Sequence, residues 1–245
     1  QAAKLYVDGS LAATKAGFNI DTQPPTAGDY RVVVTNVYGT VNSNAATVTV
    51  VPGTLAGYTD GLIAYYPFNS NANDESGSDN HGAVNGATLT TDRTGVTGKA
   101  YSFDGVNDYI VGAKNLPDTQ QLTISAWIKP NEDKYAGIFY DASFNQSGRD
   151  TMLATLTGNS VQANFTKNSA ASTGIIKATG VLQNQTWTHA VLTLGPNGSS
   201  LFINGVLNGT SAVVSHNVGY HSNPYIGAEN HGAGVQYFFN GTLDD

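Results

Sequence analysis

The segment Leu201–Leu207, with the sequence LFINGVL, holds the clearest indication of the fold, because Asn-Gly alone separates two apolar runs. Asn-Gly tolerates the positive φ angles of a two-residue hairpin turn, so the segment predicts two antiparallel strands. Further glycine-containing turn signals lie at 104–105, 196–198 and 208–209. Around this segment we therefore expect strands joined by tight turns.

Apolar and alternating runs of strand length recur through residues 61–245, and no stretch keeps a helical period of 3.6 residues beyond two turns. About a dozen short strands in this space predict a single all-β antiparallel sandwich. The predicted strands are Leu62–Phe68, Ala100–Phe103, Asp108–Val111, Leu122–Ile128, Gly137–Ala142, Met152–Leu156, Ser160–Phe165, Gly174–Thr179, Thr188–Leu194, Ser200–Ile203, Tyr225–Ala228 and Tyr237–Asn240.

The first fifty residues form a second group of short predicted strands, with a hairpin turn at 36–39. These strands are Lys4–Asp8, Gly17–Ile20, Gly28–Val37 and Ala45–Val51. A Pro- and Gly-containing stretch follows them and is typical of a linker. We expect a domain at 1–52, a linker at 53–60 and a second domain at 61–245.

The composition excludes several classes of protein. The 245 residues carry a net charge of −7 with only 11 Lys and Arg, so we expect no nucleic-acid partner. No apolar run reaches membrane-spanning length, so we expect no membrane insertion. Cys is absent, which rules out disulfides and thiolate metal sites.

The segment Thr26–Asn36 resembles the late strands of immunoglobulin-like repeats in bacterial surface proteins. The resemblance implies a tyrosine-corner role for Tyr30 and places Val32 where such domains often carry a cysteine. Nothing in the chain corresponds to the first two strands of such a domain. Residues 1–52 are therefore expected to be a partial immunoglobulin-like domain.

Residues 61–245 resemble the laminin-G-like jelly rolls of the concanavalin A-like lectin/glucanase superfamily. The resemblance implies an antiparallel jelly-roll sandwich whose last strand follows the final Asp pair, so we expect that strand to be missing here. The motifs that carry it are 61–68, Asp74–Gly77, Asn80–Gly82, Tyr101–Gly105, Leu122–Ile128, Trp187–His189, Leu201–Gly205, Tyr225–Gly227 and Phe239–Asp245.

The loop from Asp74 to Gly82 is rich in carboxylate and amide oxygens, the donors that Ca²⁺ prefers. The family resemblance implies a structural calcium site that ties this loop to the C-terminal Asp pair. Its expected ligands are Asp74, Asn80, the main-chain carbonyl of His81, and Asp244. The alternative is that the loop's polar side chains form only turn hydrogen bonds with the backbone.

Two loops, 139–150 and 216–225, combine aromatic, amide and basic residues in the manner of saccharide sites. The alternative is that they are ordinary polar loops of a sandwich. The candidate ligand-binding residues are Tyr140, Arg149, Asn164, His221 and Tyr225. Trp127, Trp187 and His189 are better explained by packing within the sheet than by ligand contact.

Catalysis has little support in this sequence. Glycoside hydrolysis needs a pair of carboxylates at a fixed separation, and hydrolases of this superfamily carry Glu-x-Asp-x-x-Glu on one strand. That motif is absent, and the three glutamates are dispersed at Glu75, Glu132 and Glu229. We therefore predict that the protein is not an enzyme and assign no catalytic residues.

We expect a non-catalytic extracellular module, secreted or on a cell surface, that binds a glycan or a surface protein and belongs to a longer polypeptide or larger assembly. Such modules place specificity in loops on a rigid scaffold. One alternative is a structural protein that decorates a virion, sheath or surface layer. Another is an accessory domain of a larger polysaccharide-degrading enzyme.

Overall fold

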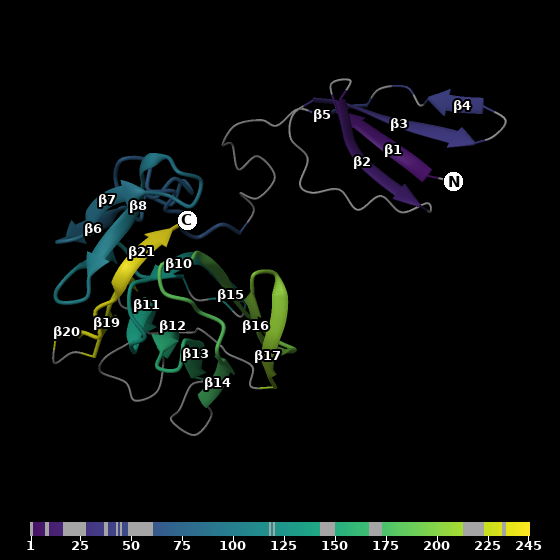
Figure 1. The fold of residues 1–245 in the computed structure, drawn as a ribbon. Helices are drawn as coiled ribbons and strands as arrows, with labels where there is room; N and C mark the ends of the chain where they lie inside the picture. Colours follow the sequence, from purple (N-terminus) through teal and green to yellow (C-terminus); the bar gives the residue numbers. More distant parts are fainter. Residues whose placement is uncertain are drawn as a thin grey trace. The chain divides into compact units, whose positions relative to one another are not determined.

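The computed structural model describes residues 2–7, 10–16, 28–36, 39–42, 44, 46–48, 61–117, 119, 121–142, 150–166, 173–212, 223–231 and 234–245. The chain divides into two compact units, Gln1–Thr59 and Asp60–Asp245 (Figure 1). Strands are the regular structure in both units, and the described residues contain no α-helix. None of them therefore forms an apolar helix long enough to cross a membrane.

The first unit is a five-stranded antiparallel sheet in the order β2-β1-β3-β4, with β5 also paired to β3. The strands are β1 (Ala2–Val7), β2 (Ser10–Ala16), β3 (Gly28–Asn36), β4 (Gly39–Asn42) and β5 (Ala46–Val48). The hairpin at 36–39 is confirmed, and its return is divided between β4 and β5. The immunoglobulin-like resemblance stays a prediction, because the side chains of Tyr30 and Val32 and the predicted strand Gly17–Ile20 lie outside the described residues.

The second unit contains two seven-stranded antiparallel sheets. Sheet I has the order β17-β16-β15-β10-β21-β8-β7, and its strands are β7 (Thr88–Thr91), β8 (Thr97–Asp104), β10 (Leu122–Pro130), β15 (Thr188–Gly195), β16 (Gly198–Ile203), β17 (Val206–Ser211) and β21 (Asn240–Asp244). Sheet II has the order β14-β13-β12-β11-β18-β9-β6, and its strands are β6 (Gly82–Asn85), β9 (Tyr109–Gly112), β11 (Ala136–Ala142), β12 (Asp150–Leu156), β13 (Ser160–Thr166), β14 (Thr173–Ala178) and β18 (Tyr225–Ile226). A small hairpin joins β19 (Glu229–Asn230) to β20 (Val235–Gln236).

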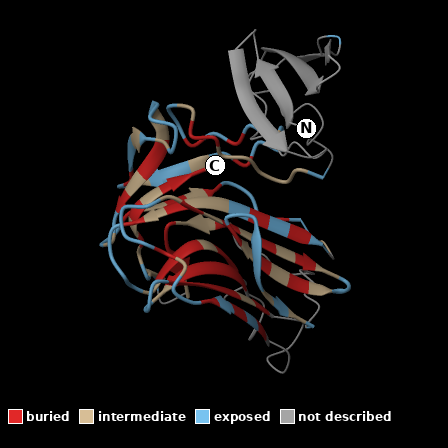
Figure 2. Cartoon of the chain, turned by 45° about the vertical axis from the view of Figure 1, so that its right-hand side comes forward, coloured by how far each residue is buried: buried red, intermediate tan, exposed pale blue. Residues whose placement is uncertain are grey.

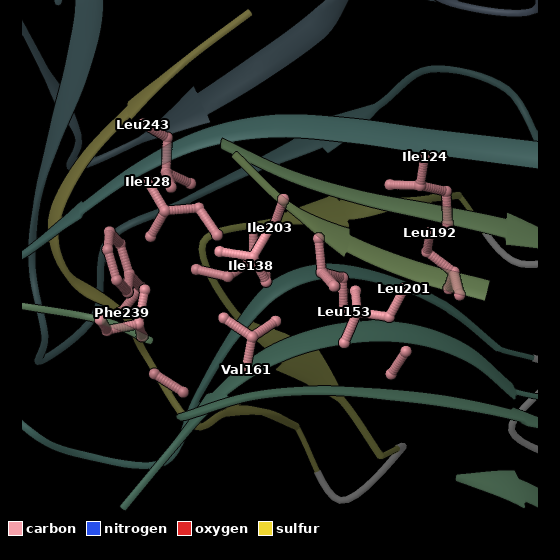
Figure 3. Close-up of a cluster of buried hydrophobic side chains, with 14 of the residues drawn as sticks. Ile124, Ile128, Ile138, Leu153, Val161, Leu192, Leu201, Ile203, Phe239 and Leu243 are labelled. Carbon is pink, nitrogen blue, oxygen red and sulfur yellow. The ribbon is translucent and has the colours of Figure 1, made fainter. Parts of the chain in front are cut away.

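The main core lies between the two sheets. Burial alternates strictly along β15, as expected for a strand with one face on the core. Figure 2 shows buried residues interleaved with intermediate and exposed ones along the strands of the second unit. Figure 3 shows side chains from the two sheets meeting in this layer. Sheet I contributes Ile124, Ile128, Leu192, Leu201, Ile203 and Leu243, and sheet II contributes Ile138, Leu153 and Val161.

The Asn-Gly hairpin predicted from the sequence is confirmed, because Ile203 pairs with Val206 across a two-residue turn. Asn204 and Gly205 have φ angles of 50° and 76°, the left-handed values that such a turn requires. The all-β antiparallel sandwich is likewise confirmed, and the arrangement agrees with a concanavalin A-like jelly roll.

Three local predictions were wrong. Leu62–Phe68 is not a strand, because the Tyr65 N–H donates to the Asp74 carboxylate and the Tyr65 carbonyl accepts from the Glu75 N–H, instead of pairing with a neighbouring strand. The 208–209 pair is not a turn but the site of a register shift where β17 pairs with β16. The predicted strand at 237–240 begins instead at Asn240, as β21 between β10 and β8.

Candidate functional site

One face of sheet II carries a row of paired side chains that we call the tyrosine row. Tyr225 pairs with Tyr140, Tyr140 with Met152, and Met152 with Asn164. Cross-strand partners in an antiparallel sheet point to the same side. Leu153, next to Met152, lies in the main core, so the row faces away from that core. The register therefore brings three predicted ligand-binding residues to one face of the sheet, where Tyr140 is buried and Asn164 and Tyr225 are half-buried.

Asn164 is the most unusual member of the tyrosine row. Its side-chain oxygen is buried and accepts no hydrogen bond from the described part of the chain. Leaving a buried polar atom unsatisfied costs about 1–3 kcal/mol. The next residue across the sheet, Ile175, is 53% exposed, so the row ends at solvent. A ligand hydroxyl could donate the missing hydrogen bond to Asn164 once the side chain moves enough to expose this oxygen.

The other two predicted ligand-binding residues, Arg149 and His221, lie outside the described residues. Met152 belongs to the row but was not predicted, because its position emerges only from strand register. Tyr140 and Met152 form a small second cluster with Ala154 on this face. The row is therefore anchored by its own packing as well as by the sheet.

A buried carboxylate lies beside the tyrosine row. Glu229 on β19 has no exposed surface, and its Oε1 accepts a hydrogen bond from the Tyr135 hydroxyl at 2.8 Å. His231 Nε2 lies 2.7 Å from the other carboxylate oxygen. Burial, reinforced by the Glu229 charge, raises the pKa of Tyr135, so its hydroxyl remains a hydrogen-bond donor. Sequence patterns gave no signal for this cluster, because Tyr135 lies 94 residues before Glu229 in the chain.

The predicted calcium residues of the 74–82 loop are held by hydrogen bonds within the protein. Asp74 Oδ1 accepts backbone N–H bonds from Tyr65 and Ser76, and Oδ2 accepts one from Asn80, all at 2.9 Å. Burial alone would raise the pKa of Asp74, but these bonds and the Ser76 side chain lower it overall. The His81 ring accepts a hydrogen bond from the Asp74 N–H. The loop therefore matches the turn-bond alternative.

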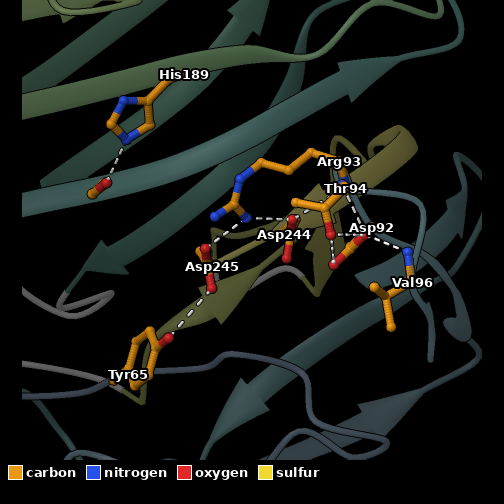
Figure 4. Close-up of polar contacts among 9 residues, drawn as sticks. Tyr65, Asp92, Arg93, Thr94, Val96, His189, Asp244 and Asp245 are labelled. Carbon is orange, nitrogen blue, oxygen red and sulfur yellow. Dashed lines mark hydrogen bonds and ion pairs between the residues drawn. The ribbon is translucent and has the colours of Figure 1, made fainter. Parts of the chain in front are cut away.

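Asp244, the fourth predicted ligand, pairs with an arginine (Figure 4). Arg93 reaches from the β7–β8 connection, and its Nη1 lies 2.6 Å from carboxylate oxygens of both Asp244 and Asp245. Burial raises the pKa of Asp244, while the hydrogen bond from Arg93 opposes that rise. Tyr65 links Asp245 to the 74–82 loop. Its hydroxyl is 3.5 Å from Asp245 Oδ1, and its backbone N–H donates to the Asp74 carboxylate.

The predicted ligands do not fit a common calcium site in this structure. They are Asp74, Asn80, His81 and Asp244. Asn80 Oδ1 accepts a hydrogen bond from the Lys114 backbone N–H at 2.7 Å. The main-chain carbonyl of Asn80 accepts one from the Tyr66 hydroxyl at 2.6 Å. The Asp74 and Asp244 carboxylates are likewise engaged by N–H groups and by a guanidinium. Among the described residues, no three carboxylate or imidazole groups converge on one point. Calcium binding remains an untested prediction of the sequence.

Trp127 packs on the outer face of sheet I, as the sequence indicated. Its ring stacks on His189 at 4.8 Å between centroids, and the Arg93 guanidinium lies 5.0 Å from the ring centre. His189 also bonds the Ser125 hydroxyl at 2.8 Å. Trp187 contacts the Lys129 ammonium group at 5.8 Å. These contacts give both tryptophans and His189 structural partners within the protein.

A separate cavity of about 370 Å³ lies beside the 74–82 loop. It is lined by Gly61, Leu62, Ile63, Ser78, Asn80, Lys114, Asn115 and Pro117. Lys114 is committed there, because its ammonium group donates to the Ser78 carbonyl at 2.6 Å. The cavity includes none of the predicted ligand-binding residues, so we place the candidate site on the tyrosine row.

The two antiparallel sheets packed on a common core define an all-β jelly-roll sandwich. Residues 104–245 match the family model described as the concanavalin A-like lectin/glucanases superfamily, and the chain belongs to this family. A search of curated protein sequences found no significant relative.

Several solved structures are similar to parts of this chain. Domain 4 of AbnA, a GH43 extracellular arabinanase from Geobacillus stearothermophilus in complex with arabinotriose, is 17% identical with a TM-score of 0.54. That match covers 75% of this chain and 89% of the domain. The Limulus polyphemus SAP-like pentraxin is 23% identical, with a TM-score of 0.46 and 59% and 72% coverage of this chain and that one. The Ruminococcus gnavus sialidase module CBM40 bound to sialyllactose is 14% identical, with a TM-score of 0.44 and 51% and 74% coverage.

Proposed function

We propose that this protein is a non-catalytic extracellular module that binds glycans through the tyrosine row. The observation that carries the proposal is the register of sheet II, which places Tyr225, Tyr140 and Asn164 on one face. Aromatic rings suit the C–H faces of sugars, and the Asn164 amide oxygen suits a hydroxyl. A rigid sheet holds these groups in fixed positions, which reduces the entropy cost of binding.

A neutral saccharide is the ligand class that we favour. The similar arabinanase domain was solved with arabinotriose, which supports a saccharide ligand and makes arabinotriose the first probe. The same similarity favours an accessory domain of a polysaccharide-degrading enzyme over a decoration protein. The buried Glu229 beside the row opposes binding of an anionic sugar at this point.

The test is a glycan array followed by calorimetric titration with the best neutral ligand. Asn164→Ala removes the unsatisfied oxygen, and we expect it to weaken binding about tenfold without loss of stability. Leu207→Ala, at a 53% exposed position of β17 on the other sheet, is the matched control and should bind as the wild type does. Uniform signals across the array, equal to those of an unrelated protein, would instead support a purely structural protein.

A further inference from the structure

Tyr237 is an exposed aromatic residue held in a costly backbone conformation. Its side chain is 46% exposed, and its φ of 53° lies in the left-handed region that non-glycine residues avoid. Such a conformation costs about 1–2 kcal/mol and persists only where the surroundings impose it. Gly137 helps to impose it, because its N–H donates to the Tyr237 carbonyl at 2.9 Å.

The Tyr237 ring is fixed by edge contacts with two other rings. Its centroid lies 5.0 Å from that of Tyr135 at 88°, and 5.5 Å from that of His231 at 84°. The His231 ring lies 5.0 Å from Tyr140, the central member of the tyrosine row. Tyr237 and His231, which we call the Tyr237 patch, therefore continue the row at its Tyr140 position.

Beneath the patch, the buried Glu229 sets the orientation of His231. A carboxylate oxygen only accepts hydrogen bonds, so Nε2 donates to Glu229, and Nδ1 is the ring nitrogen left for another partner. The His231 side chain is 40% exposed. The Tyr135 hydroxyl holds the other carboxylate oxygen and so fixes the position of Glu229.

We propose that the Tyr237 patch is a second saccharide subsite, contiguous with the tyrosine row and specific for a neutral sugar ring. The Tyr237 ring contacts the C–H face of the sugar, and His231 Nδ1 forms a hydrogen bond with a sugar hydroxyl, which can donate or accept. Glu229 and Tyr135 are positioning residues for this pair. The inference rests on the proposed glycan function and adds to it the residues that bind a neighbouring sugar unit.

A structural role explains the Tyr237 patch less well. Burial of the Tyr237 ring contributes little to stability, because nearly half of the residue is in solvent. The strained backbone also offers no gain in stability by itself. A rigid exposed ring at fixed orientation is instead a common feature of binding surfaces, because little side-chain entropy is lost on binding.

The experiment titrates arabinotriose, and the tightest neutral oligosaccharide of the array, against the full chain and its variants. Tyr237→Ala should weaken binding about tenfold or more while the melting temperature stays that of the wild type. Tyr237→Phe keeps the ring that contacts the sugar, so its affinity should remain within about twofold of wild type. His231→Ala should weaken binding, and Leu207→Ala serves as the exposed apolar control.

The outcomes separate this inference from the proposed function. If Asn164→Ala weakens binding and Tyr237→Ala binds like Leu207→Ala, the subsite is wrong and the glycan function stands. If Tyr237→Ala loses melting temperature in parallel with affinity, the ring is structural and the subsite is also wrong. If the wild type binds no neutral saccharide, both proposals fail.

Discussion

Arg93 Nη1 lies 2.6 Å from Asp244 Oδ2, and this ion pair joins the β7–β8 connection to the C-terminal strand β21. Only 3% of the Asp244 side chain is exposed, so the guanidinium compensates a buried negative charge. The same guanidinium contacts Trp127 and Asp245. One side chain therefore secures the C-terminal strand to its neighbours.

Arg93→Ala should destabilise the second unit by about 2 kcal/mol, because it leaves the Asp244 carboxylate buried without its cation. Denaturant unfolding followed by tryptophan fluorescence reports on this unit alone, since both tryptophans, Trp127 and Trp187, lie in it. The pKa of Asp244 is already raised by burial, so the deficit should be greatest at neutral pH and shrink in acid as the carboxyl is protonated. Arg93→Lys keeps the charge and should recover part of the loss. Equal stability of all three proteins would contradict this role.

The same variant tests the calcium prediction. A cation could reach Asp244 and Asp245 only by displacing the guanidinium that now binds both. We therefore expect about 1 mM calcium, compared with chelator, to leave the melting temperature of the wild type unchanged. The Arg93→Ala protein should gain a few degrees from calcium if the freed carboxylates form a site. A calcium-dependent rise in the melting temperature of the wild type would support the predicted calcium site over the pairing of Arg93 with Asp244 and Asp245.

Gly205→Ala should cost about 1–2 kcal/mol in the second unit. Gly205 has a φ of 76°, and an added Cβ would meet no atom within 4 Å, so the penalty is purely conformational. Gly195→Ala is the matched control in the neighbouring hairpin. An added Cβ there would make an ordinary 3.8 Å contact, and the φ of Gly195 lies outside the left-handed region. The control should be neutral or slightly stabilising. Fluorescence-detected unfolding of the two variants measures the difference, and equal losses would argue against the turn geometry.

Features encoded within a few residues were predictable from the sequence. The Asn204–Gly205 turn and the strand predicted at 188–194 depend on local chemistry, and both were confirmed. Leu62–Phe68 has strand-like composition but is not a strand, because Asp74, nine residues beyond Tyr65, takes its backbone N–H. Short-range patterns do not reveal such tertiary competition for hydrogen bonds.

The candidate site also contains some residues that local sequence could predict and others that it could not. Tyr140 and Tyr225 could be chosen because they lie in polar aromatic segments, and strand register then placed them side by side. Met152 and Glu229 could not be chosen, because their roles depend on pairings and burial that span the whole sheet. The Arg93–Asp244 pair is separated by 151 residues and had no sequence signature.

Asp74→Asn should lower stability by about 1–3 kcal/mol at neutral pH, because an amide cannot accept all three backbone hydrogen bonds. The pKa of Asp74 is depressed below its ordinary 3.8, so the ionised form contributes stability above that value. That contribution is lost as pH falls through the depressed pKa. The difference in unfolding free energy between wild type and variant should therefore be largest at neutral pH and shrink as the pH falls below 3.8. A gap that stays constant with pH would show that the effect is steric.

Gly137→Ala should disturb the Glu229 cluster directly. An added Cβ would lie 2.6 Å from Glu229 Cγ and 2.7 Å from the Ala228 carbonyl carbon, and backbone cannot yield as a flexible side chain does. We expect a loss of about 1–3 kcal/mol from overpacking. Because β19 carries Glu229 and leads into His231, saccharide affinity should fall as well. Gly195→Ala again provides the control for a glycine change at a strand residue of this unit. Wild-type affinity in a destabilised Gly137→Ala protein would show that the position of β19 does not matter for binding.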